Sequence, residues 1–139
     1  MSATQQHKDT LQTRLGELAA DMEAQNLDGL MARYDDALVF VENGKEMDKA
    51  GLKAYVQDLW AGDTGFSVDL ATMHAVDDVL AVTLEASMSA ETASGEKVTL
   101  SWPMFVSYQF DLDTLKVVRE VAFSDETAIA EKFAAAGVA

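Results

Sequence analysis

The sequence contains no cysteine, one proline and two histidines in 139 residues. Without cysteine, the chain can form neither a disulfide framework nor a thiolate metal site. Neither His7 nor His74 has a partner histidine at helical or hairpin spacing, so we expect no metal and no cofactor. No glycine-rich loop follows a strand pattern, which argues against a phosphate-binding loop.

Basic residues and long apolar runs are also scarce. No apolar segment is long enough to span a bilayer, and the first ten residues lack the apolar core of a signal peptide, so we expect a cytoplasmic protein. Ten basic residues against 24 acidic ones give a formal charge of −14. This charge repels nucleic acid and anionic lipid, so neither is an expected partner. It is interpreted as a charge that favours solubility, although it leaves a cationic partner open.

Apolar spacing predicts three helices in the first half of the chain. The first is predicted over about 9–25, because four apolar residues recur there at intervals of three and four, namely Leu11, Leu15, Leu18 and Met22. Asn26 is predicted to cap a second, shorter helix over 27–34. A short strand is predicted over 37–41, and Asp48 is predicted to cap the third helix.

From residue 66 the apolar period changes to two, which indicates strands. The predicted strands cover 66–76, 79–90, 98–110 and 115–123. The longest carries seven alternating apolar positions, namely Val98, Leu100, Trp102, Met104, Val106, Tyr108 and Phe110. Pro103 interrupts it and needs an edge, a bulge or an unpaired position, because proline has no N–H for a ladder.

A final helix is predicted over 124–137, with Ser124 as its N-cap and Gly137 at its end. Helices that precede a run of hairpin-connected strands indicate an α+β protein with one antiparallel sheet, covered by helices on one face. The length indicates a single domain over residues 1–139.

Three segments resemble the nuclear transport factor 2-like superfamily, which includes the SnoaL-like and ketosteroid isomerase-like families. They are "NLDGLMARYDDALVFV", "GKEMDKAGLKAYVQDLW" and "LKVVREVAFSD", and the resemblance covers about residues 8–125. It implies a cone-shaped, strongly curved sheet wrapped around N-terminal helices, with a deep apolar pocket. It also implies a homodimer formed through the outer sheet face. Members include isomerases, cyclases, dehydratases and hydrolases, as well as binding modules without catalytic activity.

The chain departs from two patterns of catalytic residues in these families. Isomerase-like relatives place a catalytic acid in the first strand, where this chain has Val39, Phe40 and Val41. SnoaL-like relatives often carry an aspartate in the last strand, where this chain has Ala122. These departures argue against ketosteroid isomerase chemistry and weaken the case for the cyclase mechanism.

Two residues are candidates for acid–base catalysis. Asp36 shares a side with Tyr34 in the first strand, although a solvated corner between helix and strand is the alternative interpretation. His74 continues the alternation of the strand over 66–76, which places it on the apolar side as a candidate general base. The alternative is a partly exposed histidine near the end of that strand.

Five residues are candidates for ligand binding, namely Tyr34, Trp60, Trp102, Met104 and Arg119. Core packing is the alternative for the aromatic residues and the methionine. The Arg119 guanidinium is suited to binding a carboxylate ligand, or to pairing with Glu85 or Glu120 on the sheet surface.

The sequence therefore leads to two hypotheses for function. The first is a SnoaL-like pocket protein that binds a small apolar or weakly polar ligand. The alternative is a general acid–base enzyme, such as an isomerase, cyclase, dehydratase or hydrolase, that acts on a small apolar substrate. In either case a homodimer is expected, because the outward positions Val79, Ala81, Thr83 and Phe105 are uncharged.

Overall fold

The computed structural model describes residues 3–61 and 65–138, and within them the chain forms four helices and six strands. Their bounds are α1 (Ala3–Glu23), α2 (Leu27–Met31), β1 (Tyr34–Glu42), β2 (Lys45–Met47), α3 (Lys49–Ala61), β3 (Ser67–Val76), β4 (Val79–Glu91), β5 (Lys97–Phe110), β6 (Val117–Phe123) and α4 (Glu126–Ala135). The predicted α+β class is confirmed. No helix in the described part of the chain is long and apolar enough to cross a membrane.

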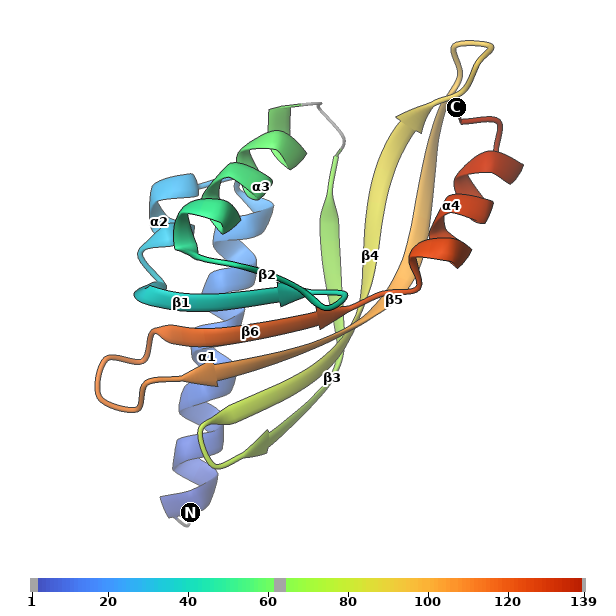
Figure 1. The fold of residues 1–139 in the computed structure, drawn as a ribbon. Coiled ribbons are helices and arrows are strands. Elements are labelled where there is room, and N and C mark those ends of the chain that lie inside the picture. The colour runs from blue at the N-terminus through green and yellow to red at the C-terminus, as the bar shows by residue number, and fades with distance from the viewer. Residues whose placement is uncertain (1–2, 62–64, 139) are drawn as a thin grey trace.

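The strands form one curved sheet in the order β2-β1-β6-β5-β4-β3. Figure 1 shows β3, β4 and β5 bending together, with α1, α2 and α3 grouped on one side and α4 beside the far ends of β4 and β5. The sheet is mixed and not purely antiparallel, because β1 and β6 run parallel. It curls without closing, since β2 and β3 each have a single neighbour. Pro103 lies on β5 beyond the last residue that pairs with β6, as proline requires.

The core lies between the helices and the inner face of the sheet. From α1, Leu11, Leu15 and Leu18 are at most 4% exposed, which confirms the predicted apolar stripe. From α3, Leu52 and Val56 are buried against the same core. Burial of such side chains stabilises the fold by roughly 1.5–3 kcal/mol each.

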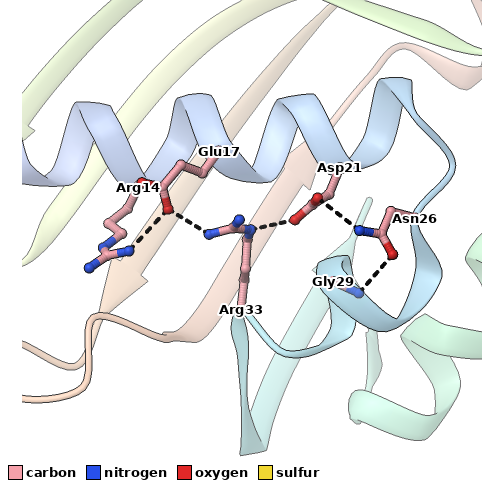
Figure 2. Close-up of polar contacts among 6 residues, drawn as sticks. All are labelled: Arg14, Glu17, Asp21, Asn26, Gly29 and Arg33. Carbon is pink, nitrogen blue, oxygen red and sulfur yellow. Dashed lines mark hydrogen bonds and ion pairs between the residues drawn. The ribbon is translucent and has the colours of Figure 1, made fainter.

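An ion-pair network attaches α1 to the start of β1, as Figure 2 shows. The guanidinium of Arg33 donates to the carboxylate of Glu17 at 2.7 Å and to that of Asp21 at 2.6 Å. The hydrogen bond with Arg33 is the largest cause of the lowered pKa of Glu17. Because Arg33 immediately precedes Tyr34, the network fixes the point at which Tyr34 enters the core.

Two of the three predicted helix caps are confirmed. The side chain of Asn26 accepts a hydrogen bond at the start of α2, and that of Asp48 does so at the start of α3. The prediction for α4 was wrong by one residue, because Asp125 is its cap. Ser124 is not available, since Asn43 bonds to its backbone N–H and to its hydroxyl.

Register shifts interrupt three of the strands. In β3 the shift lies between Leu70 and Thr72, so Ala71 has no partner on β4. In β6 the shift lies between Val117 and Arg119, so Val118 has no partner on β5. A longer irregularity lies near the start of β1. An extra residue in a strand exchanges the two faces for every residue beyond it, so these shifts decide which side chains face the core.

Candidate active site

A cavity of about 90 Å³, here called the inner chamber, lies between the helices and the inner face of the sheet. Most of its lining is apolar and includes Leu15, Leu18, Met22, Phe40, Leu52, Val56, Leu70, Leu84, Met104 and Val106. Its polar side chains are Tyr34, Glu42, Tyr55, Tyr108 and Glu120. A water-poor site with a few convergent polar groups is the usual form of a small-molecule site.

A second cavity of about 260 Å³, here called the outer chamber, lies where α4 faces the sheet. Its lining includes Met88 and Trp102 from the sheet and Ile129 from α4. Five residues line both chambers, namely Glu42, Tyr55, Leu59, Phe66 and Met104. The two chambers are therefore contiguous, and the outer one lies next to α4.

Glu120 is the buried acid of the inner chamber. It is 7% exposed, and its carboxylate accepts a hydrogen bond of 2.7 Å from the hydroxyl of Tyr34. Burial raises the pKa of Glu120 to about 7, and the negative charge of Glu42 contributes to the increase, whereas the hydrogen bond from Tyr34 opposes it. A carboxyl group with such a pKa can both release and accept a proton near neutral pH.

Tyr108 lies directly opposite Glu120 in the β5–β6 pair, and both side chains line the inner chamber. Tyr108 is 7% exposed, and its hydroxyl takes part in none of the hydrogen bonds of the described residues. Burial raises the pKa of Tyr34 and of Tyr108 well above the ordinary value, and the charge of Glu120 adds to both increases. Both phenols therefore keep their protons and remain hydrogen-bond donors.

Glu42 and Tyr55 lie where the two chambers meet. The hydroxyl of Tyr55 donates to the carboxylate of Glu42 at 3.1 Å. Burial and the negative charge of Glu42 raise the pKa of Tyr55. Glu42 has further acceptor positions that this single hydrogen bond does not use.

The structure brings together three of the five predicted ligand-binding residues. Tyr34 and Met104 line the inner chamber, and Met104 and Trp102 line the outer one. Trp102 also packs against Phe133 of α4, with ring centroids 6.0 Å apart. Trp60 packs against the core and is not among the described residues that line either chamber.

The predicted orientation of His74 was wrong. The extra residue Ala71 reverses the alternation, so Met73 and Ala75 pack against the core while His74 is exposed on the outer face of the sheet. The expected convergence of His74 with Tyr34 in the cavity is therefore absent.

Asp36 and Arg119 also lie outside the cavity. The side chain of Asp36 is 99% exposed and forms an ion pair of 3.1 Å with Lys49, which agrees with the solvated-corner interpretation. The irregularity in β1 separates it from Tyr34. Arg119 is exposed because the extra residue Val118 turns it to the outer face, and it forms no ion pair within the described part of the chain.

Glu120 was missed as a site residue for the same reason. Counted from Val117, strict alternation places Glu120 on the outer face, but the shift at Val118 turns it inward. The usable signal was its spacing of two residues from Ala122, because both residues line the inner chamber. Among the described residues, no group of three or more histidine, aspartate or glutamate side chains could hold a metal ion.

No family model and no curated protein matches the sequence, whereas solved structures match the fold closely. A provisionally assigned SnoaL-like polyketide cyclase from Shewanella putrefaciens CN-32 aligns with a TM-score of 0.79 and 10% identity, over 91% of this chain and 86% of its own. A similarly assigned protein from Shewanella denitrificans OS-217 gives 0.77 and 12%, over 91% and 98%. An LEH-like epoxide hydrolase from M. tuberculosis gives 0.74 and 11%, over 94% and 93%. The chain therefore has the SnoaL-like, nuclear transport factor 2-like fold.

Proposed function

We propose that the protein binds a small, largely apolar molecule in the two chambers, and that Glu120 transfers a proton to or from it. The observation that carries this proposal is the buried Glu120–Tyr34 hydrogen bond inside an apolar cavity. The inner chamber, at about 90 Å³, is far smaller than the roughly 300–1,000 Å³ of typical ligand sites. It therefore admits one end of the molecule, while the remainder occupies the outer chamber.

The chemistry follows from how each group is held. Tyr34 fixes the position of the Glu120 carboxylate through its hydrogen bond, so it acts as a positioning residue. The apolar lining keeps water away, which favours proton transfer to the bound molecule over transfer to solvent. Tyr108, on the facing strand, is placed to form a hydrogen bond with a polar group of that molecule.

A neutral bicyclic probe tests whether Glu120 is a working base. Nitrobenzisoxazole opens when a base takes its carbon-bound proton, its N–O bond breaks, and a coloured cyanophenolate forms. We expect the rate with the unaltered protein to be about a hundredfold higher than the rate with the variant Glu120→Gln. The rate should rise with pH as the carboxyl group ionises, with a midpoint near its pKa of about 7. Absorbance of the product measures the rate.

The matched control is Glu96→Gln, which removes the same charge from an exposed position in the β4–β5 turn. It should retain the full rate. Equal rates for Glu120→Gln and the unaltered protein would show that Glu120 is not a base accessible to the bound probe.

We also propose a homodimer formed through the outer face of the sheet. From β3 to β1, two cross-strand rows on this face contain no charged residue, in a chain of net charge −14, and the first row reaches a charge only at Glu46 of the edge strand β2. One row consists of His74, Ala81, Ser107, Val121 and Val41, and the other of Thr72, Thr83, Phe105 and Phe123. Depletion of charge with exposed aromatic side chains is the composition of an interface core.

The adjacent rings of Phe105 and Phe123 supply the test, because they are 45% and 51% exposed and pair directly across β5 and β6. We expect the unaltered protein to sediment as a dimer and the double substitution Phe105→Lys, Phe123→Lys to sediment as a monomer. Leu112→Lys, at a 51% exposed position outside the two rows, should leave the dimer intact. A monomeric unaltered protein at micromolar concentration contradicts this proposal.

A further inference from the structure

The cavity is rich in negative charge and hydrogen-bond acceptors. Three carboxylates line the two chambers: Glu120 in the inner one, Glu126 in the outer one, and Glu42 in both. No lysine, arginine or histidine is among the described residues that line either chamber. A carboxylate or phosphate ligand would therefore be bound without a compensating positive charge, which is costly in an apolar site.

Glu42 and Glu120 lie close to one another on adjacent parallel strands. Glu42 is the register partner of Ala122, so Glu120 is its diagonal neighbour, two residues earlier on β6. Both side chains line the inner chamber, and the charge of Glu42 acts on the proton affinity of Glu120. Adjacent strands lie about 4.8 Å apart and parallel strands rise about 3.3 Å per residue, so these diagonal neighbours are roughly 8 Å apart at the backbone, which leaves room for a group that contacts both carboxylates.

Tyr108 gives a second and independent indication of a ligand. Its side chain is more than nine-tenths buried, since only 7% is exposed, yet its hydroxyl takes part in none of the hydrogen bonds of the described residues and lines the inner chamber. A buried polar group without a partner is costly, so such groups are normally satisfied by a ligand or by water. Because Tyr108 faces Glu120 across the β5–β6 pair, a ligand group that reaches Glu120 is also within its reach.

We infer that the natural ligand is an apolar amine, whose protonated nitrogen lies between Glu42 and Glu120 while its apolar body lies in the outer chamber. The inference rests on the proposed function, because it uses the same cavity. An ammonium group supplies several N–H donors, which match the free acceptor positions of the two carboxylates and the oxygen of Tyr108. The body of the ligand packs against Trp102 and Met104 below α4.

The arrangement explains why the lining carries acids at all. Ammonium groups lose hydration when they enter an apolar site, and only pairing with well-placed carboxylates offsets that loss. The aromatic rings of Tyr55 and Phe66 at the junction provide further favourable contact with a cation. Glu126, whose carboxylate accepts from Asn43 at 2.7 Å, adds negative charge on the side of the outer chamber.

Three probes of nearly equal shape test the inference by isothermal titration calorimetry on the full chain. They are naphthylethylamine, naphthylethanol and naphthylacetic acid, which are positive, neutral and negative at neutral pH. We expect the amine to bind about tenfold more tightly than the alcohol, which corresponds to about 1.4 kcal/mol, and the acid to bind least. Glu42→Gln should lower the affinity for the amine about tenfold and leave that for the alcohol nearly unchanged. Glu96→Gln, an exposed control of the same charge change, should alter neither.

The outcomes separate this inference from the proposed function. If the alcohol binds as tightly as the amine, or if Glu42→Gln weakens both equally, the amine inference is wrong while an apolar binding cavity remains. If the acid binds best, the inference is likewise wrong. If no probe binds, both the amine inference and the proposed small-molecule site are contradicted. Acceleration of the benzisoxazole reaction depends on Glu120 and a neutral probe, so it can succeed or fail independently of these affinities.

Discussion

Replacement of Glu120 by glutamine should make the protein more stable than the unaltered chain at about pH 8, but not at about pH 4. The folded-state pKa of Glu120 is about 7, against an ordinary value of 4.5. Between these two values, the folded protein holds a proton that the unfolded chain has already released. The contribution of Glu120 to the free energy of unfolding therefore falls as the pH rises through this window, by about 3 kcal/mol for this difference between the two pKa values. Glutamine carries no titrating proton and should not show this decrease.

Urea unfolding at a series of pH values, followed by tryptophan fluorescence, measures the effect. The quantity of interest is the difference in unfolding free energy between Glu120→Gln and the unaltered protein, because the titration of most other carboxyl groups cancels in it. That difference should rise with pH and level off above the pKa of about 7. Glu96→Gln, at an exposed position, should give a nearly flat difference. A flat difference for Glu120→Gln as well would mean that its pKa is not raised by folding.

The destabilising acid is informative about function. A buried carboxylate opposes folding at neutral pH, and a hydrophobic residue at the same position would stabilise the fold more. Its retention in an apolar chamber, with Tyr34 positioned to bind it, is the pattern expected of a group held for chemistry. The unfavourable burial of the Glu120 carboxylate is offset by the hydrophobic core around α1 and the inner face of the sheet.

Local signals in the sequence predicted much of the fold. The caps at Asn26 and Asp48 depend on residues a few positions apart, which the sequence shows directly. The alternation of β4 was also predictable, because β4 and β5 pair from Val79 to Glu91 without a register shift. Along such a stretch, the inward residues of β4 remain those of even number, and Leu80, Val82, Leu84 and Ala86 are all buried.

The site itself depended on features that alternation cannot show. The hydrogen bond between Tyr34 and Glu120 joins residues separated by 86 positions, on two strands that pair in parallel without being consecutive. The hairpin patterns in the sequence indicate pairing only between consecutive strands. They therefore did not predict that Tyr34 and Glu120 lie next to each other. A bulge depends on tertiary curvature and has no fixed sequence signature, so the single extra residues Ala71 and Val118 reversed the predicted faces of His74 and Arg119.

The same irregularities connect the fold with the candidate site. Bulges bend and twist the strand that contains them, so they help to give the sheet its concave inner face. In β6, the shift also exchanges Arg119 for Glu120 at the cavity, which replaces a cation by an acid. The chain thus has a carboxyl group on the inner face of the last strand, two residues before Ala122. In β3, the shift moves His74 to one of the two uncharged rows proposed as the dimer interface.

Truncation of Leu80 to alanine should destabilise the protein by about 3–5 kcal/mol. Leu80 is 0% exposed and lies between Ala75 of β3 and Tyr108 of β5, so its removal leaves a cavity in the sheet side of the core. Because β4 pairs with β3 on one side and with β5 on the other, the structure around Leu80 can relax only partly. Both the lost burial and the remaining void therefore contribute to the loss. The unfolding free energy from urea titration, with the slope unchanged, measures the loss.

Val76→Ala provides the control within the same hairpin, because Val76 is 68% exposed at the end of β3. Its cost should lie within about 0.5 kcal/mol of zero, as for ordinary surface substitutions. The comparison tests the face assignment beyond the bulge, since with Leu70 opposite Leu84, Leu80 pairs with Ala75 only if Ala71 is the extra residue. Without that bulge, His74 and Val76 would both share the inner face with Leu70. Similar losses for Leu80→Ala and Val76→Ala would therefore contradict the register that places His74 on the outer face.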